Sequence, residues 1–560
     1  MGRTISVSLP LVLVLLGSWC QGQTASPSRP TNGDSLARGY QLPTVPKVRL
    51  TPVQERSLSL LRSAEVETTA SGPEIRAFVL WQSSLAYSLI EPSLAASAAE
   101  NSFRASLAIE GTPSDEPCGR VGGDLKNWIQ QSVFSDLIKK DRISKTEGLL
   151  PYATESVRGM VIAELAQYYL ERKDIARSRA LLSRIVASEQ YPFRVAADVL
   201  RAMKVEESAD RMALFSQALN NFGQHEFGGM PGTANDFGMF VELTWDLIPP
   251  VLALEAINKV LEQAKSGDSD LRITMSSKKG SATLNSIYEL RLFEFLPILE
   301  QLDSGKAESL LRENANVQSQ LERYPRGPLS LDSNGRMASI GYSQGNAPEA
   351  TGFIAREQIQ ARIGQQMNAI GKEAGHDPAQ AISDALALPL TDSLQSASPR
   401  ANMLEAIARA TAKENPVIAT SALREILRVQ DQLSPQQMQG LGDLPSIYLD
   451  LGDSEGAQSA LKALLKTADK LYAADVKPDS PNLAFKARWP STELWRHCID
   501  IADRLSPGHA EQVIAGIPDP EIAAIERVSL AGTLLGAPIG SGFASECRKN
   551  GSNSNLSYRK

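Results

Sequence analysis

Residues 154–182 read TESVRGMVIAELAQYYLERKDIARSRALL. The apolar positions of the first half recur with the helical period of 3.6 residues and therefore share one face; they are Val157, Val161, Leu165, Tyr168 and Tyr169. Thr154 is a suitable N-cap for this helix. After a turn at Lys173 and Asp174, a second set faces inward, namely Ile175, Ser178, Leu181, Leu182 and Ile185. The stretch therefore predicts two antiparallel helices joined by a short turn.

Residues 444–465, LPSIYLDLGDSEGAQSALKALL, repeat this spacing. The matched pairs are Leu165 with Leu444, Tyr169 with Tyr448, Asp174 with Asp453, Ser178 with Ala457 and Leu182 with Leu461. The two segments resemble tetratricopeptide-type hairpins in their large, aromatic and small positions and in the turn at Gly452 and Asp453. The Trp of that family's first helix and its terminal Pro are absent. The resemblance implies an α-solenoid, in which each hairpin buries its apolar face against its neighbours.

The same alternation of helix and proline turn extends beyond these copies. Pro73 and Pro520 stand where helices are predicted to begin, and Asn415-Pro416 separates two helical stretches. We therefore predict an all-α fold of stacked helical hairpins, either a curved superhelix or a partly closed α/α arrangement. The predicted arrays span residues 48–325 and 350–546, with a linker at 326–349. Residues 273–285 contain β-prone runs on either side of Lys278-Lys279-Gly280, which favours a small β-hairpin.

The N-terminus has the layout of a secretory signal peptide. Arg3 precedes the apolar run at residues 9–16, and small or polar residues follow, so residues 1–22 are interpreted as a cleaved signal. The apolar run is shorter than the roughly 20 residues that a membrane-spanning helix needs, which disfavours the alternative of a retained anchor. Trp19 stands where a lipobox needs a small residue before Cys20. We expect an exported protein, periplasmic or extracellular, with a flexible leader at 23–47 and a polar tail at 547–560.

Charge and cysteine content exclude several functional classes. The net charge is -7, and the basic residues are scattered, so no nucleic-acid footprint is present. Cleavage would leave Cys118, Cys498 and Cys547, which allow at most one intramolecular disulfide. Histidine and cysteine do not cluster with metal-ligand spacing, and we expect no metal and no cofactor.

Short motifs give little support for catalysis. Residues 341–345, GYSQG, match the nucleophile motif of serine hydrolases, but no strand-like run precedes Ser343, and we interpret it as part of the linker. The glycine-rich stretch at 221–250 is the best candidate for a ligand or partner site, because long loops are often functional. Its candidate binding residues are His225, Glu226, Asp236, Glu242, Trp245 and Asp246. The alternative is a capping loop whose Phe side chains plug one end of the solenoid.

These observations favour a non-enzymatic interaction scaffold with a protein or peptide partner, because stacked hairpins present extended surfaces and no catalytic residues are expected. The alternative is a helical carbohydrate-active enzyme that uses paired carboxylates, with Asp236, Glu242 and Asp246 as its candidates.

Overall fold

The computed structural model describes residues 50–110, 121–185, 191–223, 233, 236–266, 271–331, 339–344, 363–390, 397–477 and 485–537. The predicted signal peptide, the whole of the predicted leader and the polar tail lie outside these residues, as do Cys118, Cys547, His225 and Glu226. Residues 50–560 belong to one compact unit.

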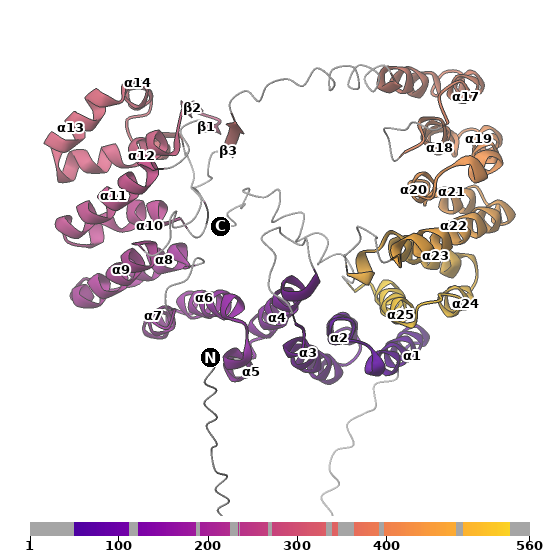
Figure 1. Cartoon of the computed structure of the whole chain (residues 1–560), viewed down its shortest axis with the longest axis horizontal. Helices are drawn as coiled ribbons and strands as arrows, with labels where there is room; N and C mark the ends of the chain where they lie inside the picture. Colours follow the sequence, from indigo (N-terminus) through magenta and orange to yellow (C-terminus); the bar gives the residue numbers. More distant parts are fainter. Residues whose placement is uncertain are drawn as a thin grey trace, which may run out of the picture. The chain divides into compact units, whose positions relative to one another are not determined.

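The chain folds into stacked helical hairpins, as predicted (Figure 1). The first part comprises α1 (Pro52–Glu67), α2 (Pro73–Tyr87), α3 (Pro92–Leu107), α4 (Val121–Lys139), α5 (Ile143–Leu149), α6 (Glu155–Glu171), α7 (Ile175–Leu182), α8 (Phe193–Ala202), α9 (Ser208–Gly223), α10 (Phe237–Thr244), α11 (Pro250–Lys265), α12 (Ile287–Leu302), α13 (Ser304–Glu313), α14 (Ala315–Arg323) and α15 (Pro328–Leu331).

The second part comprises α17 (Pro378–Leu386), α18 (Pro399–Thr411), α19 (Pro416–Val429), α20 (Pro435–Gln439), α21 (Leu444–Asp450), α22 (Ser454–Asp475), α23 (Pro490–Leu505), α24 (His509–Ala515) and α25 (Pro520–Leu535), and residues 363–373 are also helical. Short 3₁₀ turns are η1 (Thr68–Ala70), η2 (Leu150–Tyr152), η3 (Val205–Glu207), η4 (Trp245–Leu247), η5 (Gln430–Gln432) and η6 (Lys486–Arg488).

The two hairpins that resemble each other in sequence share the same turn. Asp174 and Asp453 cap the second helix, accepting from the backbone N–H three residues on at 3.1 and 2.8 Å. Their own N–H groups donate to Tyr169 and Tyr448 carbonyls at 2.9 Å in both copies. The preceding residue has positive φ, 64° at Lys173 and 75° at the other copy's glycine. The predicted register is therefore correct at the turn.

The turn between α4 and α5 is a third copy, which the sequence pattern did not reveal. Asp141 has φ of 59°, and the N–H of Arg142 donates to the Leu137 carbonyl at 2.9 Å. Arg142 stands at the capping position but makes no capping hydrogen bond through its side chain. Because this copy lacks the capping carboxylate, its sequence carried no helix-start signal.

The matched tyrosines of the two hairpins, Tyr169 and Tyr448, differ in burial, and the residue three places after the capping aspartate explains why. A Cβ at Gly456 would lie 2.4 Å from the Tyr448 ring, so the glycine lets this ring pack closely, and Tyr448 is 1% exposed. Arg177 occupies the equivalent place in the first copy. Its guanidinium lies over the ring of Tyr169, which is only partly buried.

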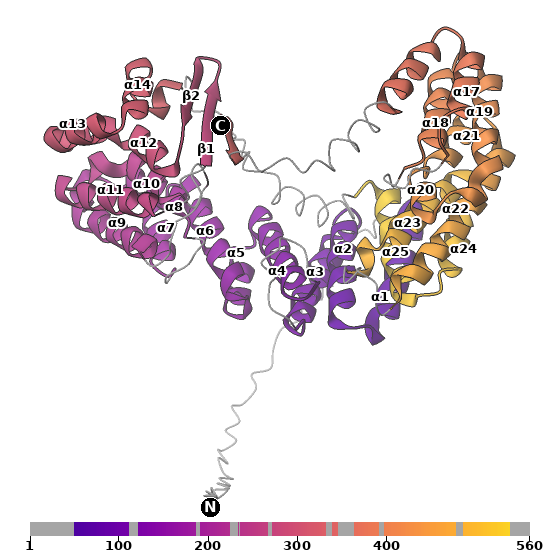
Figure 2. The same cartoon turned by 45° about the horizontal axis from the view of Figure 1, so that its top comes forward.

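The predicted β-hairpin is present and pairs with an additional strand. β1 (Leu271–Ser277) and β2 (Gly280–Leu284) are antiparallel, and Figure 2 shows them beside α12 and α14. β3 (Ser339–Gln344) pairs antiparallel with the other edge of β1, with Ser343 opposite Arg272. Residues 326–349, predicted to be a linker, include α15 and β3. The local sequence pattern did not indicate β3, because its partner strand lies about 70 residues away in the sequence.

The first and last helices contact each other directly. α25 packs against α1 and α2, so the second array joins the start of the first (Figure 1). Arg56 on α1 binds Asp503 at 2.6 Å and Glu511 at 2.7 Å. The rings of Phe78 and Phe485 meet at 4.9 Å between centroids. One continuous hydrophobic core runs through the described helices. Within these residues, no helix is both long and apolar enough to span a membrane.

Candidate functional site

A buried group of charges lies where α10 meets α12. Asp236 caps α10, with its Oδ1 accepting from the Gly238 N–H at 2.8 Å, and it is 1% exposed. Arg291 on α12 donates from Nη2 to the same oxygen at 2.7 Å and from Nη1 to Glu294 at 2.7 Å. A Cβ at Gly238 would lie 2.2 Å from Nη1, so glycine is needed for the guanidinium to reach Asp236. The group is enclosed by the two helices that it joins.

The charges in this group are unbalanced. Burial, and then the nearby Glu294 and Asp236 carboxylates, raise the pKa of Glu242 to about 8. Burial also raises the pKa of Glu294, although Arg291 opposes it. Burial disfavours charge on Arg291, but Asp236 and Glu294 outweigh this effect and raise its pKa. One positively charged guanidinium thus lies near three carboxyl groups, and protonation of Glu242 removes the excess negative charge.

The structure brings together only some of the predicted site residues. Asp236 and Glu242 interact electrostatically, whereas Asp246 is exposed and Trp245, in η4, is partly buried against the core. Because Asp236 is enclosed and engaged by Arg291, it has no open face for a sugar. The arrangement does not support glycoside hydrolysis by paired carboxylates, which must flank an accessible bond.

Sequence reasoning missed Arg291 and Glu294. They lie 55 and 58 positions after Asp236, which no local pattern could connect. A signal was present all the same, since both sit in the apolar stretch LRLFEFL at residues 290–296, where unpaired charges are rarely tolerated. Residues three or four apart are neighbours on a helix, so the spacing of this Arg and Glu in an apolar helix is the signal of an internal ion pair that sequence reasoning passed over.

The aromatic residues of the glycine-rich stretch pack into the interior. Phe222 stacks on Phe237 with centroids 4.3 Å apart, and Phe237 contacts Phe193 and Phe240 at 5.2 and 5.6 Å. These rings fill the space between α8, α9 and α10. They are core residues within the stack, so the described Phe side chains do not plug one of its ends.

An open groove of about 800 Å³ crosses α4, α6 and α8. We call it the α6 groove, and its lining residues are Gln131, Ser135, Ile138, Lys139, Met160, Ala163, Glu164, Gln167, Tyr168, Glu171, Arg172, Pro192 and Val195. The α6 members recur every three or four residues, so one face of this helix forms the floor. Its size lies within the range of about 300 to 1,000 Å³ typical of ligand sites.

The α6 groove contains polar groups held in defined positions. Ser135 donates to both Glu164 oxygens at 2.9 Å, and partial burial raises the pKa of that carboxyl group despite this bond. At the rim, the Tyr168 hydroxyl donates to Asp141, and the Arg172 guanidinium lies 3.5 Å from the ring centroid. The ring is therefore ordered before any ligand arrives, which lowers the entropic cost of binding.

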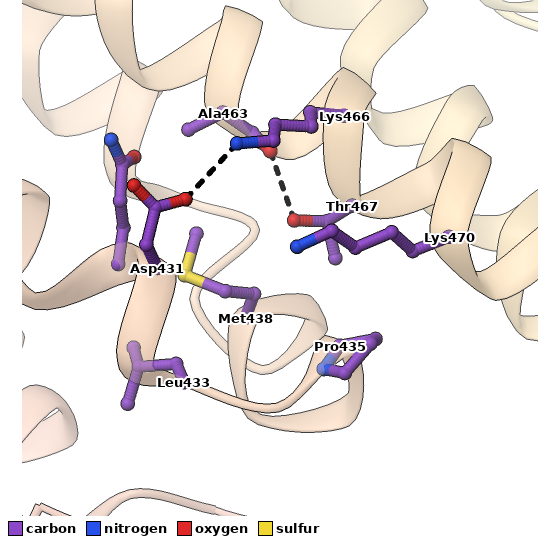
Figure 3. Close-up of a pocket in the computed structure, with 9 residues that line it drawn as sticks. Asp431, Leu433, Pro435, Met438, Ala463, Lys466, Thr467 and Lys470 are labelled. Atoms are coloured by element: carbon purple, nitrogen blue, oxygen red, sulfur yellow. Dashed lines mark hydrogen bonds and ion pairs between the residues drawn. The ribbon is translucent and has the colours of Figure 1, made fainter.

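A smaller cavity lies between η5, α20 and α22 (Figure 3). Its volume is about 30 Å³, and it is bordered by Asp431, Met438 and Lys466. Lys466 binds Asp431 at 3.1 Å, and Thr467 donates to the Ala463 carbonyl at 2.9 Å. This space suits a water molecule or two and excludes a substrate-sized ligand.

Chemical features of a catalytic or metal site are sparse in the described residues. No cluster of His, Cys, Asp and Glu there could hold a metal ion. Cys498 is fully buried in α23, and burial raises the pKa of its thiol, which makes it a poor nucleophile. Ser343 lies within β3, whereas a nucleophile elbow places its serine on the turn after a strand.

Comparison with known proteins identifies no family. No protein-family model matches the chain, and no curated protein matches it. Among solved structures, the chain is similar to a circular tandem repeat protein with novel repeat topology and enhanced subunit contact surfaces. The match has 11% identity, covers 90% of this chain and 98% of that one, and has a TM-score of 0.14. That score is too low to support any argument about fold or function.

Proposed function

We propose that this protein is an exported, non-enzymatic interaction scaffold that binds a peptide segment of a partner protein in the α6 groove. The observation that carries the proposal is the groove itself. It crosses three helices of successive hairpins and has a volume of about 800 Å³. Helical-repeat proteins commonly use such surfaces for binding.

The lining of the α6 groove suits a peptide of low net charge. Lys139 and Arg172 oppose Glu164 and Glu171, so the charged side chains balance. Gln131 and Gln167 carry amides that can both donate to and accept from a peptide backbone. Ile138, Met160 and Val195 offer apolar contacts between these polar groups. We therefore expect an extended segment that alternates apolar and uncharged polar side chains.

Peptide selection with a matched pair of variants tests this proposal. A random 12-residue peptide library is selected on the purified protein, and affinities of the selected peptides are measured by fluorescence anisotropy. Ala163→Trp fills the floor of the groove, whereas Ala180→Trp adds the same side chain to an exposed position of α7. We expect Ala163→Trp to lower the affinity for the selected peptides by at least tenfold and Ala180→Trp to have little effect on it. Equal binding by both variants would place the peptides elsewhere and contradict the proposal.

Export rests on the tripartite N-terminus, which lies outside the described residues. Intact-mass measurement of the protein recovered from outside the cytoplasm should give a chain that begins near Gln23. A mature chain that retains Met1, or one lipidated at Cys20, would show that the signal is misinterpreted.

A further inference from the structure

A second groove, separate from the α6 groove, lies between α12, α13 and α14. Its volume is about 560 Å³, which again falls within the range typical of binding sites. The floor is apolar and includes Leu296, Leu311 and Leu321. Leu296 is 4% exposed, while Leu311 and Leu321 are partly exposed to the groove. We call this the α13 groove.

Every ionisable side chain that lines the α13 groove is acidic. Glu300 comes from α12, Glu308 from α13 and Glu322 from α14, and all three residues are exposed. Glu308 has a cationic neighbour, Arg312, at 3.7 Å, but both side chains are more than 70% exposed, so solvent screens the pair. Three helices thus place one carboxylate each around a shared apolar floor.

This combination specifies the chemistry of the occupant. The apolar floor requires a ligand with leucine-like side chains, and the acidic rim requires positive charge beside them. A helix with apolar residues at i, i+3 or i+4 and i+7, flanked by Lys or Arg, meets both conditions. The acidic rim repels nucleic acids and anionic lipid surfaces, which share its negative charge.

We propose that the α13 groove binds a cationic amphipathic helix of a partner protein. This inference does not depend on the function proposed for the α6 groove, because the two grooves share no lining residue. The apolar floor accounts for affinity, and the three carboxylates account for selection of basic over acidic segments.

Three labelled peptides of equal length test the ligand chemistry by fluorescence anisotropy. The first is an amphipathic helix of leucine and lysine, the second replaces lysine with glutamate, and the third replaces leucine with serine. We expect the first peptide to bind, with an affinity that falls as salt is raised from 50 to 500 mM. The other two peptides should bind at least tenfold more weakly. If the third peptide, which contains lysine and serine, bound as tightly as the first, the attraction would be to charge alone and the proposal would be overturned. So would failure of the first peptide to bind.

Two triple variants then locate the binding. One neutralises the rim by changing Glu300, Glu308 and Glu322 to Gln. The control changes Glu147, Glu206 and Glu414 to Gln, which are exposed glutamates elsewhere, so both variants have the same net charge. We expect the rim variant to lose roughly tenfold in affinity for the leucine and lysine peptide at 50 mM salt, and the control less than twofold. Equal losses would refute the assignment to this groove. Ala163→Trp should leave this binding unchanged, which separates it from the α6 groove.

Discussion

Replacement of Glu242 by Gln should remove a pH-dependent loss of stability. Burial and the neighbouring Glu294 and Asp236 carboxylates raise the pKa of Glu242 from 4.5 to about 8 in the folded protein. The folded chain therefore keeps a proton that the unfolded chain releases between these values. The resulting contribution to stability is fully present below pH 4.5 and is lost as the pH rises to 8.

The size of this effect follows from the shift in pKa. The full shift corresponds to about 5 kcal/mol, but the side chain is only partly buried, so solvent reduces the effect to about 2 to 3 kcal/mol. At pH 5 the variant and the wild type should be similar. At pH 9 Glu242→Gln should be more stable by that amount, because glutamine adds no charge beside Asp236 and Glu294.

Urea unfolding at several values between pH 5 and pH 9 measures the difference directly, and hydrogen exchange of the α10 and α12 amides shows where it acts. Asp246→Asn is the matched control, since that carboxylate is close in sequence but exposed. Its stability should follow the wild-type pH dependence. If the free energy of unfolding of Glu242→Gln also follows the wild-type pH dependence across this range, the surroundings do not disfavour the charged form of the Glu242 carboxyl group, and the reasoning fails.

Three further substitutions test the packing. Ala457→Leu should lower the free energy of unfolding by about 1 to 3 kcal/mol because residue 457 is fully buried, whereas Gln458→Leu should cost little; equal thermal stabilities would show that the hairpin register is wrong. Gly238→Ala should displace Arg291 from Asp236 and cost about 3 to 5 kcal/mol in urea unfolding, and a wild-type value would mean that the guanidinium moves freely. Phe485→Ala should cost about 3 kcal/mol and increase hydrogen exchange in both α2 and α23, because its ring contacts Phe78; an effect confined to the second array would argue against a shared core.

The sequence determined the local structure of this protein. The hairpin at residues 154–182, its repeat at 444–465 and the β-hairpin turn at Lys278 and Lys279 were all predicted and are present. These features depend on hydrophobic period, capping residues and turn residues, which act between residues close in sequence.

Tertiary structure decided the features that join distant segments. β3 was interpreted as linker because its pairing with β1 is invisible in the local pattern, and α25 gave no sign that it would pack on α1. The candidate site shows the same limit: Asp236 and Glu242 were named from the sequence, but their partner Arg291 and the burial that raises the pKa of Glu242 come from α12. Hydrogen bonding along a helix depends on nearby residues, whereas burial and ion pairing depend on which elements the whole chain brings into contact.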